Sequence, residues 1–142
     1  MNFQSQRPPP ERRCFRSQAI EEVIAATRAR IRDAELAWMF ENCFPNTLDT
    51  TVRVGKIDGK PDTFVVTGDI DAMWLRDSTA QVWPYLPLAK DDPSLQRLIA
   101  GVVYRQTRCV LIDPYANAFL PDPTSKKALS WAVDDLTDSR SK

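Results

Sequence analysis

The sequence contains no histidine among its 142 residues. This absence excludes Ser-His-Asp and Cys-His catalysis, and it excludes metal sites built on imidazole ligands. The chain also has no excess of either charge, because 19 Lys and Arg residues balance 19 Asp and Glu residues. No overall electrostatic field therefore favours binding to nucleic acid or to an anionic membrane. There is no apolar run of twenty residues, and the polar, proline-rich start does not resemble a signal peptide. We therefore expect no transmembrane segment, favour a cytoplasmic location, and are left with carboxylate chemistry for any catalysis.

Cysteine is sparse. Cys14, Cys43 and Cys109 are odd in number, far apart, and form no C-x-x-C pair. Such usage does not build a disulfide framework, so we expect buried, reduced thiols. The length and the apolar content of 43% are sufficient for the core of one ordinary domain.

Apolar spacing predicts helices in two parts of the chain, after Ser17 and after Asp92. After Ser17 as an N-cap, apolar or small residues recur with helical spacing, and residues 33–44 continue or restart that helix. Asp92 as an N-cap and Pro93 at the first helical position begin the clearest helix. The residues assigned to the core are Trp38, Met39, Phe40, Leu95, Leu98, Ile99, Val102, Val103 and Val110.

A β-hairpin is predicted between these helices. Its strands are the β-branched runs at residues 50–55 and 63–68. The expected connection is a loop containing Gly55, Gly59 and Pro61. The stretch TGDIDAMWLRDS, residues 67–78, follows the second strand and enters a helix whose start is marked by Ser78 and Gln81 in capping-box spacing.

Residues 67–78 combine three aspartates with one arginine and one tryptophan. Carboxylates and a guanidinium need hydroxyl or ionic partners, while an indole offers a flat apolar face, and this combination suits a sugar. Asp69 and Asp71 also form an Asp-x-Asp pair, a common spacing that can hold a divalent cation through hard oxygen ligands. The third alternative is structural, with capping residues and an internal Arg-Asp ion pair that braces the loop.

Four long segments resemble glycoside hydrolase family 125, the metal-independent α-mannosidases, which include fungal proteins named as meiotically up-regulated. They are RPPPERRCFRSQAIEEVI, LAWMFENCFPNTLDTTV, TGDIDAMWLRDSTAQVWPYLPLA and LIDPYANAF. The family usually has proline where this sequence has Asp71, which makes Asp71 a poor candidate for an inherited role. The resemblance implies a mainly α fold, the N-terminal part of an (α/α)6 six-hairpin glycosidase-like barrel with one small β-hairpin. It also implies inverting hydrolysis of terminal α-1,6-linked mannose in an oligosaccharide, with no metal and no cofactor.

The same resemblance supplies candidate substrate-binding residues. The arginine and aspartate of WLRDS are expected to bind mannose hydroxyls, the preceding tryptophan to face the sugar ring or the core, and the DPYANAF residues to contact sugar or to structure their loop. The candidates are Asp69, Trp74, Arg76, Asp77, Tyr115 and Asn117.

The expected organisation is a disordered lead at residues 1–16, a barrel portion at 17–122 and a divergent, disordered tail at 123–142. We expect no catalytic acid or base in this chain, because the Glu-x-Asp-Ser type segment of relatives is missing and both groups should lie downstream of residue 142. The chain would then be an N-terminal fragment of a mannosidase. One alternative is a non-catalytic carbohydrate-binding fragment, and a remote one is a cation-dependent glycosyltransferase. The sequence leaves the physiological glycan and the oligomeric state open.

Overall fold

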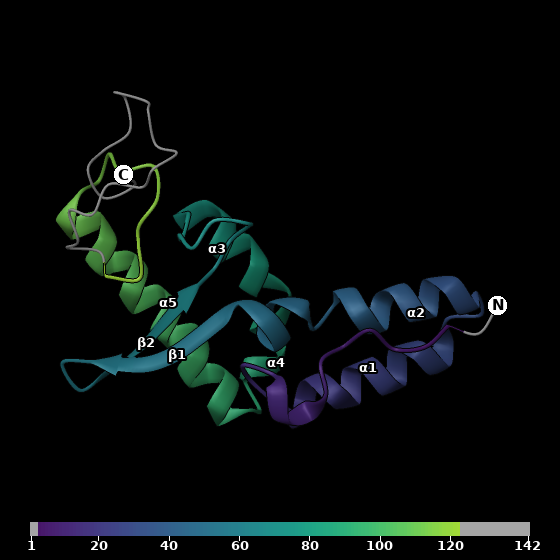
Figure 1. Cartoon of the computed structure of the whole chain (residues 1–142). Helices are drawn as coiled ribbons and strands as arrows, with labels where there is room; N and C mark the ends of the chain where they lie inside the picture. Colours follow the sequence, from purple (N-terminus) through teal and green to yellow (C-terminus); the bar gives the residue numbers. More distant parts are fainter. Residues whose placement is uncertain (1–2, 123–142) are drawn as a thin grey trace.

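The structure, a computed structural model, describes residues 3–122. This part of the chain is mainly helical and contains one two-stranded antiparallel hairpin (Figure 1). The elements are η1 (Pro10–Arg12), α1 (Gln18–Arg30), α2 (Ala34–Cys43), η2 (Thr47–Thr51), β1 (Val52–Ile57), β2 (Lys60–Val65), α3 (Leu75–Val82), η3 (Trp83–Tyr85), α4 (Leu86–Ala89) and α5 (Pro93–Ile112). None of the helices in residues 3–122 combines the length and the apolar character that a bilayer span requires.

Helices α1 and α2 lie side by side and form an arm that extends from the rest of the protein (Figure 1). Helix α1 begins after Ser17, whose Oγ accepts a hydrogen bond from the Ile20 N–H at 3.2 Å, so the predicted N-cap is confirmed. Residues 33–44 restart the helix rather than continue it. Asp33 caps α2 by accepting a hydrogen bond from the Leu36 N–H at 2.9 Å.

The hairpin has a tighter turn than the sequence predicted. Its register runs from Val52 opposite Val65 to Ile57 opposite Lys60, so the connection is a two-residue turn. The turn residues Asp58 and Gly59 both have positive φ, 53° and 75°, as type I′ hairpin turns require. The predicted wide loop is therefore wrong, because such a turn matches the twist of the strands and needs no further residues. Two residues assigned to that loop lie inside the strands instead: Gly55 and Pro61.

Helix α5 packs along β2 and supplies much of the core. The expected N-cap is confirmed, since Asp92 Oδ1 accepts hydrogen bonds from the backbone N–H groups of Ser94 and Leu95 at 2.9 and 3.0 Å. The predicted apolar stripe is too wide, because Val103 and Val110 are 58% and 47% exposed. The other four predicted stripe residues are buried: Leu95, Leu98, Ile99 and Val102.

Gly101 allows α5 to approach β2 closely. A Cβ atom at this position would lie 2.4 Å from Thr63 Oγ1 and 2.9 Å from backbone atoms of Asp62 and Thr63. Any larger side chain would therefore push the helix away from the strand.

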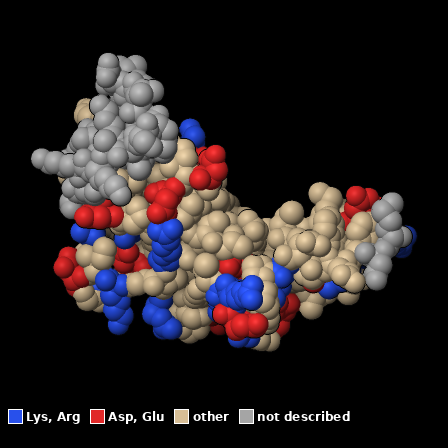
Figure 2. Space-filling model, in the orientation of Figure 1, with Lys and Arg blue, Asp and Glu red and all other residues tan. Residues whose placement is uncertain are grey.

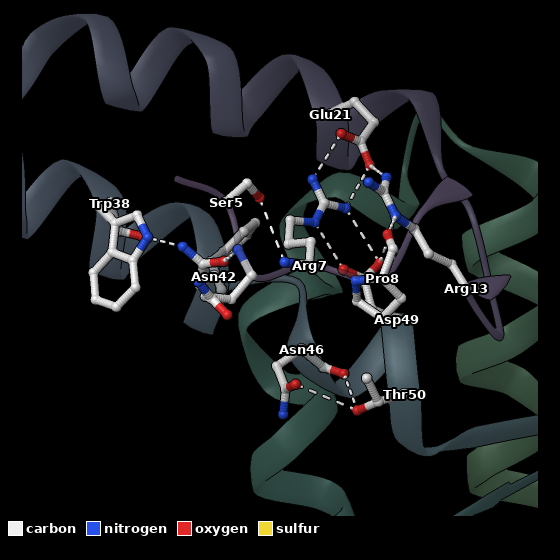
Figure 3. A network of polar contacts seen from close by, with 12 residues as sticks. Ser5, Arg7, Pro8, Arg13, Glu21, Trp38, Asn42, Asn46, Asp49 and Thr50 are labelled. Carbon is white, nitrogen blue, oxygen red and sulfur yellow. Dashed lines mark hydrogen bonds and ion pairs between the residues drawn. The ribbon is translucent and has the colours of Figure 1, made fainter. Parts of the chain in front are cut away.

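Residues 3–16 pack against the arm, in contrast to the expected disordered lead. The Arg7 guanidinium donates to both Asp49 carboxylate oxygens, at 2.7 and 3.2 Å, and to both Glu21 carboxylate oxygens, at 2.9 and 2.7 Å (Figure 3). Arg13 also donates to Glu21, at 2.9 Å. Burial opposes the charge on Arg7, but the hydrogen bonds and charges of Glu21 and Asp49 raise its pKa above the ordinary value. A polar composition suggested disorder, whereas these ionic contacts across the chain hold the segment in place.

Two of the three cysteines are not buried. Cys14 and Cys43 are exposed free thiols, and only Cys109 is buried, so the expectation of buried thiols is wrong at two positions. Burial raises the pKa of the Cys109 thiol to about 11, which keeps it protonated and unreactive near neutral pH.

The apolar residues of α2 are only partly in the core. Phe40 packs against the core, but Met39 is 46% exposed and Trp38 is half-buried, with its indole N–H donating to the Gln4 carbonyl at 2.6 Å. The surface is hollowed where α2 meets α3 and η3, and uncharged residues line this groove of about 460 Å³ (Figure 2). The assignment of α2 to the core is therefore wrong for Met39, which lines the groove.

Candidate functional site

Two backbone hydrogen bonds join the two segments that carry the predicted site residues. The Met73 N–H donates to the Phe119 carbonyl at 2.8 Å, and the Phe119 N–H donates to the Met73 carbonyl at 3.0 Å. Both residues are buried. The acidic loop after β2 and the DPYANAF turn after α5 therefore lie side by side, although 46 residues separate them in sequence (119 minus 73).

The acidic loop is folded by its own backbone and by Thr67. Thr67 Oγ1 donates to the Ala72 carbonyl at 3.3 Å and accepts from the Trp74 N–H at 3.2 Å, which closes the loop. Asp69 lies on the exposed outer side of this loop. Its carboxylate makes no hydrogen bond or ion pair with the residues that the structure describes, so it is available to an outside partner.

Helix α3 begins earlier than the sequence predicted. Trp74 is the N-cap residue, and the helix starts at Leu75, so the predicted capping box at Ser78 and Gln81 is wrong. Ser78 is fully buried inside the helix, and its Oγ donates to the Leu75 carbonyl at 3.0 Å instead of capping an N–H group. The earlier start places Asp77 in the first turn, where a negative charge interacts favourably with the helix dipole.

Arg76 and Asp77 form an exposed ion pair, with Nη2 of Arg76 3.1 Å from Oδ2 of Asp77. Their side chains are 88% and 40% exposed. An ion pair this open to water contributes little to stability, so it is a weak brace, and both groups remain able to hydrogen-bond a ligand.

The remaining candidates differ in exposure. Trp74 is half-buried, whereas Tyr115 is 92% exposed and Asn117 is also exposed. The turn that carries Tyr115 and Asn117 is fixed by Asp113, whose Oδ1 accepts a hydrogen bond from the Tyr115 N–H at 2.9 Å. The structure thus places all six candidates on two adjoining segments, with Asp69, Arg76, Tyr115 and Asn117 facing solvent most openly.

The Asp-x-Asp alternative lacks the geometry of a cation site within residues 3–122. Asp71 is paired with Arg53 of β1, with Nη2 2.6 Å from Oδ1. No group of three Asp, Glu, His or Cys residues that could hold a metal ion occurs in this part of the chain. Asp71 instead forms an exposed ion pair between the acidic loop and the hairpin.

Sequence reasoning missed two side chains that support these segments, Arg105 and Gln106 of α5. Arg105 forms an ion pair with Asp62 of β2 at 2.6 Å, and both side chains are less than 9% exposed. The available signal was its place on the apolar stripe of α5, three residues after Val102, because a charge at such a position implies a buried partner. Gln106 gave no such signal, because its partners are 27 to 31 residues away.

Comparisons with known proteins identify the class. The family described as metal-independent alpha-mannosidase (GH125) matches residues 33–142. The match includes the final twenty residues, which we had expected to diverge and which lie outside the described structure. The chain is 47% identical over 121 residues to the Meiotically up-regulated gene 157 protein of Schizosaccharomyces pombe, covering 84% of this chain and 24% of that protein.

A solved structure is similar as well. It is a metal-independent α-mannosidase from Streptococcus pneumoniae in a non-productive substrate complex with α-1,6-mannobiose, with a TM-score of 0.67 and 48% identity. The likeness covers 77% of this chain and 25% of that one. These matches define a glycoside hydrolase class. The chain belongs to the metal-independent α-mannosidases, glycoside hydrolase family 125, and spans about a quarter of the length of the relatives it matches.

Proposed function

We propose that this chain supplies mannose-binding side chains to an α-mannosidase that hydrolyses terminal α-1,6-linked mannose with inversion. The observation that carries the proposal is the Met73–Phe119 backbone pairing, which joins the WLRDS and DPYANAF segments in a member of the mannosidase family. The exposed carboxylates of Asp69 and Asp77 would accept hydrogen bonds from sugar hydroxyls, and Arg76 would donate to them.

The aromatic candidates suit the same ligand. Tyr115 presents a ring that is almost fully exposed, and Trp74 is half-buried at the start of α3. Apolar faces of pyranose rings pack on such surfaces, while the amide of Asn117 adds both a donor and an acceptor. A mannose-containing oligosaccharide is therefore the proposed partner, within a proposed (α/α)6 barrel.

The catalytic acid and base are proposed to lie outside residues 1–142. Inverting hydrolysis needs a general acid with a raised pKa and a carboxylate base about 6.5–9.5 Å away. The pKa of Glu21 is lowered by the hydrogen bond from Arg7. Burial raises the pKa of Asp92, but hydrogen bonds from Ser17, Ser94 and two backbone N–H groups outweigh it and bring the pKa to about 2. Both changes oppose the role of a general acid for Glu21 and Asp92.

The test measures binding and cleavage on one preparation of the folded 142-residue chain. Titration calorimetry with α-1,6-mannobiose should show saturable binding that is stronger than binding of the matched α-1,6-glucobiose, and mannose release should stay at the level of the blank. Absence of saturable mannobiose binding by the folded chain would overturn the mannose-binding role. Release of mannose above the blank would overturn the placement of the acid and base outside the chain.

A further inference from the structure

Gln106 of α5 binds the first turn of α3 through its side-chain amide. Its Nε2 donates to the Leu75 carbonyl at 3.1 Å, to Ser78 Oγ at 2.9 Å and to Thr79 Oγ1 at 2.9 Å. This turn carries the Arg76–Asp77 ion pair.

The preceding residue, Arg105, holds the end of the other segment. Its Nη1 donates to the Pro121 carbonyl at 2.8 Å, two residues beyond Phe119. Its Nε and Nη2 donate to the two carboxylate oxygens of Asp62 at 2.9 and 2.6 Å, and its guanidinium lies 5.2 Å from the centre of the Phe64 ring. A planar guanidinium has enough donors to hydrogen-bond β2 and residue 121 at the same time, which a lysine ammonium cannot do in the same geometry.

Consecutive residues on a helix point about 100° apart, so a neighbouring pair can contact segments on two sides of the same helix. Arg105 and Gln106 use this geometry: one side chain reaches the segment after the DPYANAF turn and the other reaches the WLRDS turn. The backbone pair of Met73 and Phe119 comes two positions before the anchored residue of each segment, Leu75 and Pro121.

We propose that Arg105 and Gln106 are positioning residues that set the spacing between the two mannose-binding segments without contacting the sugar. This inference rests on the proposed mannose-binding function. It differs from a purely structural role, because the first turn of α3 keeps other hydrogen bonds when Gln106 is replaced. Ser78 Oγ and Thr79 Oγ1 both donate to the Leu75 carbonyl independently of Gln106.

The experiment replaces Gln106 by methionine in the full chain, which retains length and helix propensity but removes the donor. Gln96→Met is the matched control, since Gln96 is an exposed glutamine of the same helix. We expect the Kd for α-1,6-mannobiose to rise about five- to tenfold in Gln106→Met, as the loss of one net hydrogen-bond contribution predicts, and to stay unchanged in Gln96→Met. A lower melting temperature with an unchanged Kd per folded molecule would overturn the proposal in favour of a structural role.

A second measurement separates this inference from the mannose-binding function. Hydrogen exchange of the Met73 and Phe119 amides reports the pairing of the two segments without sugar, and we expect it to accelerate in Gln106→Met and in Arg105→Lys but not in Gln96→Met. If the wild-type chain binds no mannobiose but the exchange of these amides still changes in the variants, the proposed function is wrong and the positioning of the two segments stands. Unchanged exchange in both variants would overturn the positioning itself.

Discussion

Ser17 Oγ donates a hydrogen bond to Asp92 Oδ2 at 2.6 Å, which joins the N-cap residues of α1 and α5 across 75 positions of sequence. Each side chain also caps its own helix, so the contact fixes the start of one helix against the start of the other. The two N-cap residues, each recognisable from its local sequence, therefore also contact each other in the folded protein.

The first prediction concerns pH. Because Asp92 has a folded-state pKa of about 2, below its ordinary value of 3.8, its contribution to the free energy of unfolding is complete above about pH 4 and is lost as the pH falls toward 2. Asp92→Asn keeps an oxygen acceptor at the cap but removes the charge, so it should be about 1 kcal/mol less stable than wild type at pH 7. Urea unfolding from pH 7 to pH 2 should show this difference disappearing. A constant difference across the range would contradict the assignment, and the comparison cancels the similar slope expected from Glu21, whose pKa is also lowered.

The second prediction concerns the N-terminal segment. Arg7→Ala should reduce the free energy of unfolding by about 3 kcal/mol, because it removes the main partner of the Asp49 carboxylate, whose side chain is only 3% exposed. Arg12→Ala is the matched control, since Arg12 is exposed. Denaturant unfolding of the two variants provides the measurement. Equal stabilities would show that the ion pairs of Arg7 add nothing to the stability of the fold.

The third prediction concerns the contact between α5 and β2. Gly101→Ala should destabilise the protein by about 1–3 kcal/mol, because the new methyl group would collide with backbone as well as with Thr63 Oγ1, and this cost exceeds the gain in helix propensity of about 1 kcal/mol. Gly55→Ala should have a much smaller effect, since the space around Gly55 is open. Thermal unfolding monitored by circular dichroism should give the lower melting temperature for Gly101→Ala. The reverse order would rule out the close approach.

The fourth prediction separates sugar binding from bracing at Arg76. Arg76→Lys keeps the charge near Asp77 but loses the fork of donors, so affinity for α-1,6-mannobiose should fall about tenfold while the melting temperature stays constant, because the side chain is 88% exposed. The exposed Arg97 provides the control, and Arg97→Lys should change neither quantity. A drop in melting temperature with unchanged affinity per folded molecule would identify a brace.

The fifth prediction concerns metal ions. Saturating Ca²⁺ or Mn²⁺, or EDTA, should leave the melting temperature of the purified chain unchanged, in agreement with a metal-independent family. A cation that bound only the native state at about 100 times its Kd would add roughly 2.7 kcal/mol, which differential scanning calorimetry would detect easily. A metal-dependent rise in the melting temperature would support a cation site at Asp69 and Asp71.

The sequence predicted the starts of α1 and α5, which depend on neighbouring residues. The caps at Ser17 and Asp92 are recognisable because a capping side chain acts on N–H groups two or three positions away. Pro61 was placed in a loop by its usual effect on strands. It lies in β2 instead, because a two-stranded sheet leaves one side of each strand unpaired and tolerates a missing N–H there.

The candidate site was predictable in its members but not in its arrangement. A resemblance between segments identified the WLRDS and DPYANAF residues, yet it carried no information about exposure, such as the 88% exposed side chain of Arg76. The backbone pair of Met73 and Phe119 depends on tertiary packing rather than on a local pattern. For the same reason Gln106, an ordinary polar residue on a half-exposed helix position, gave no sign of its contacts with α3.

Strand β1 pairs only with β2 within residues 3–122, so its other side is an open edge. An open edge can act as a template for a strand from another molecule, and proteins restrain such growth by placing charges along it. Lys56 is exposed on β1 and adds positive charge there, whereas the charge of Arg53 is paired with that of Asp71. A second copy that added its own β1 here would bring like charges together. The positive charge on β1 therefore opposes uncontrolled association of the protein through this edge.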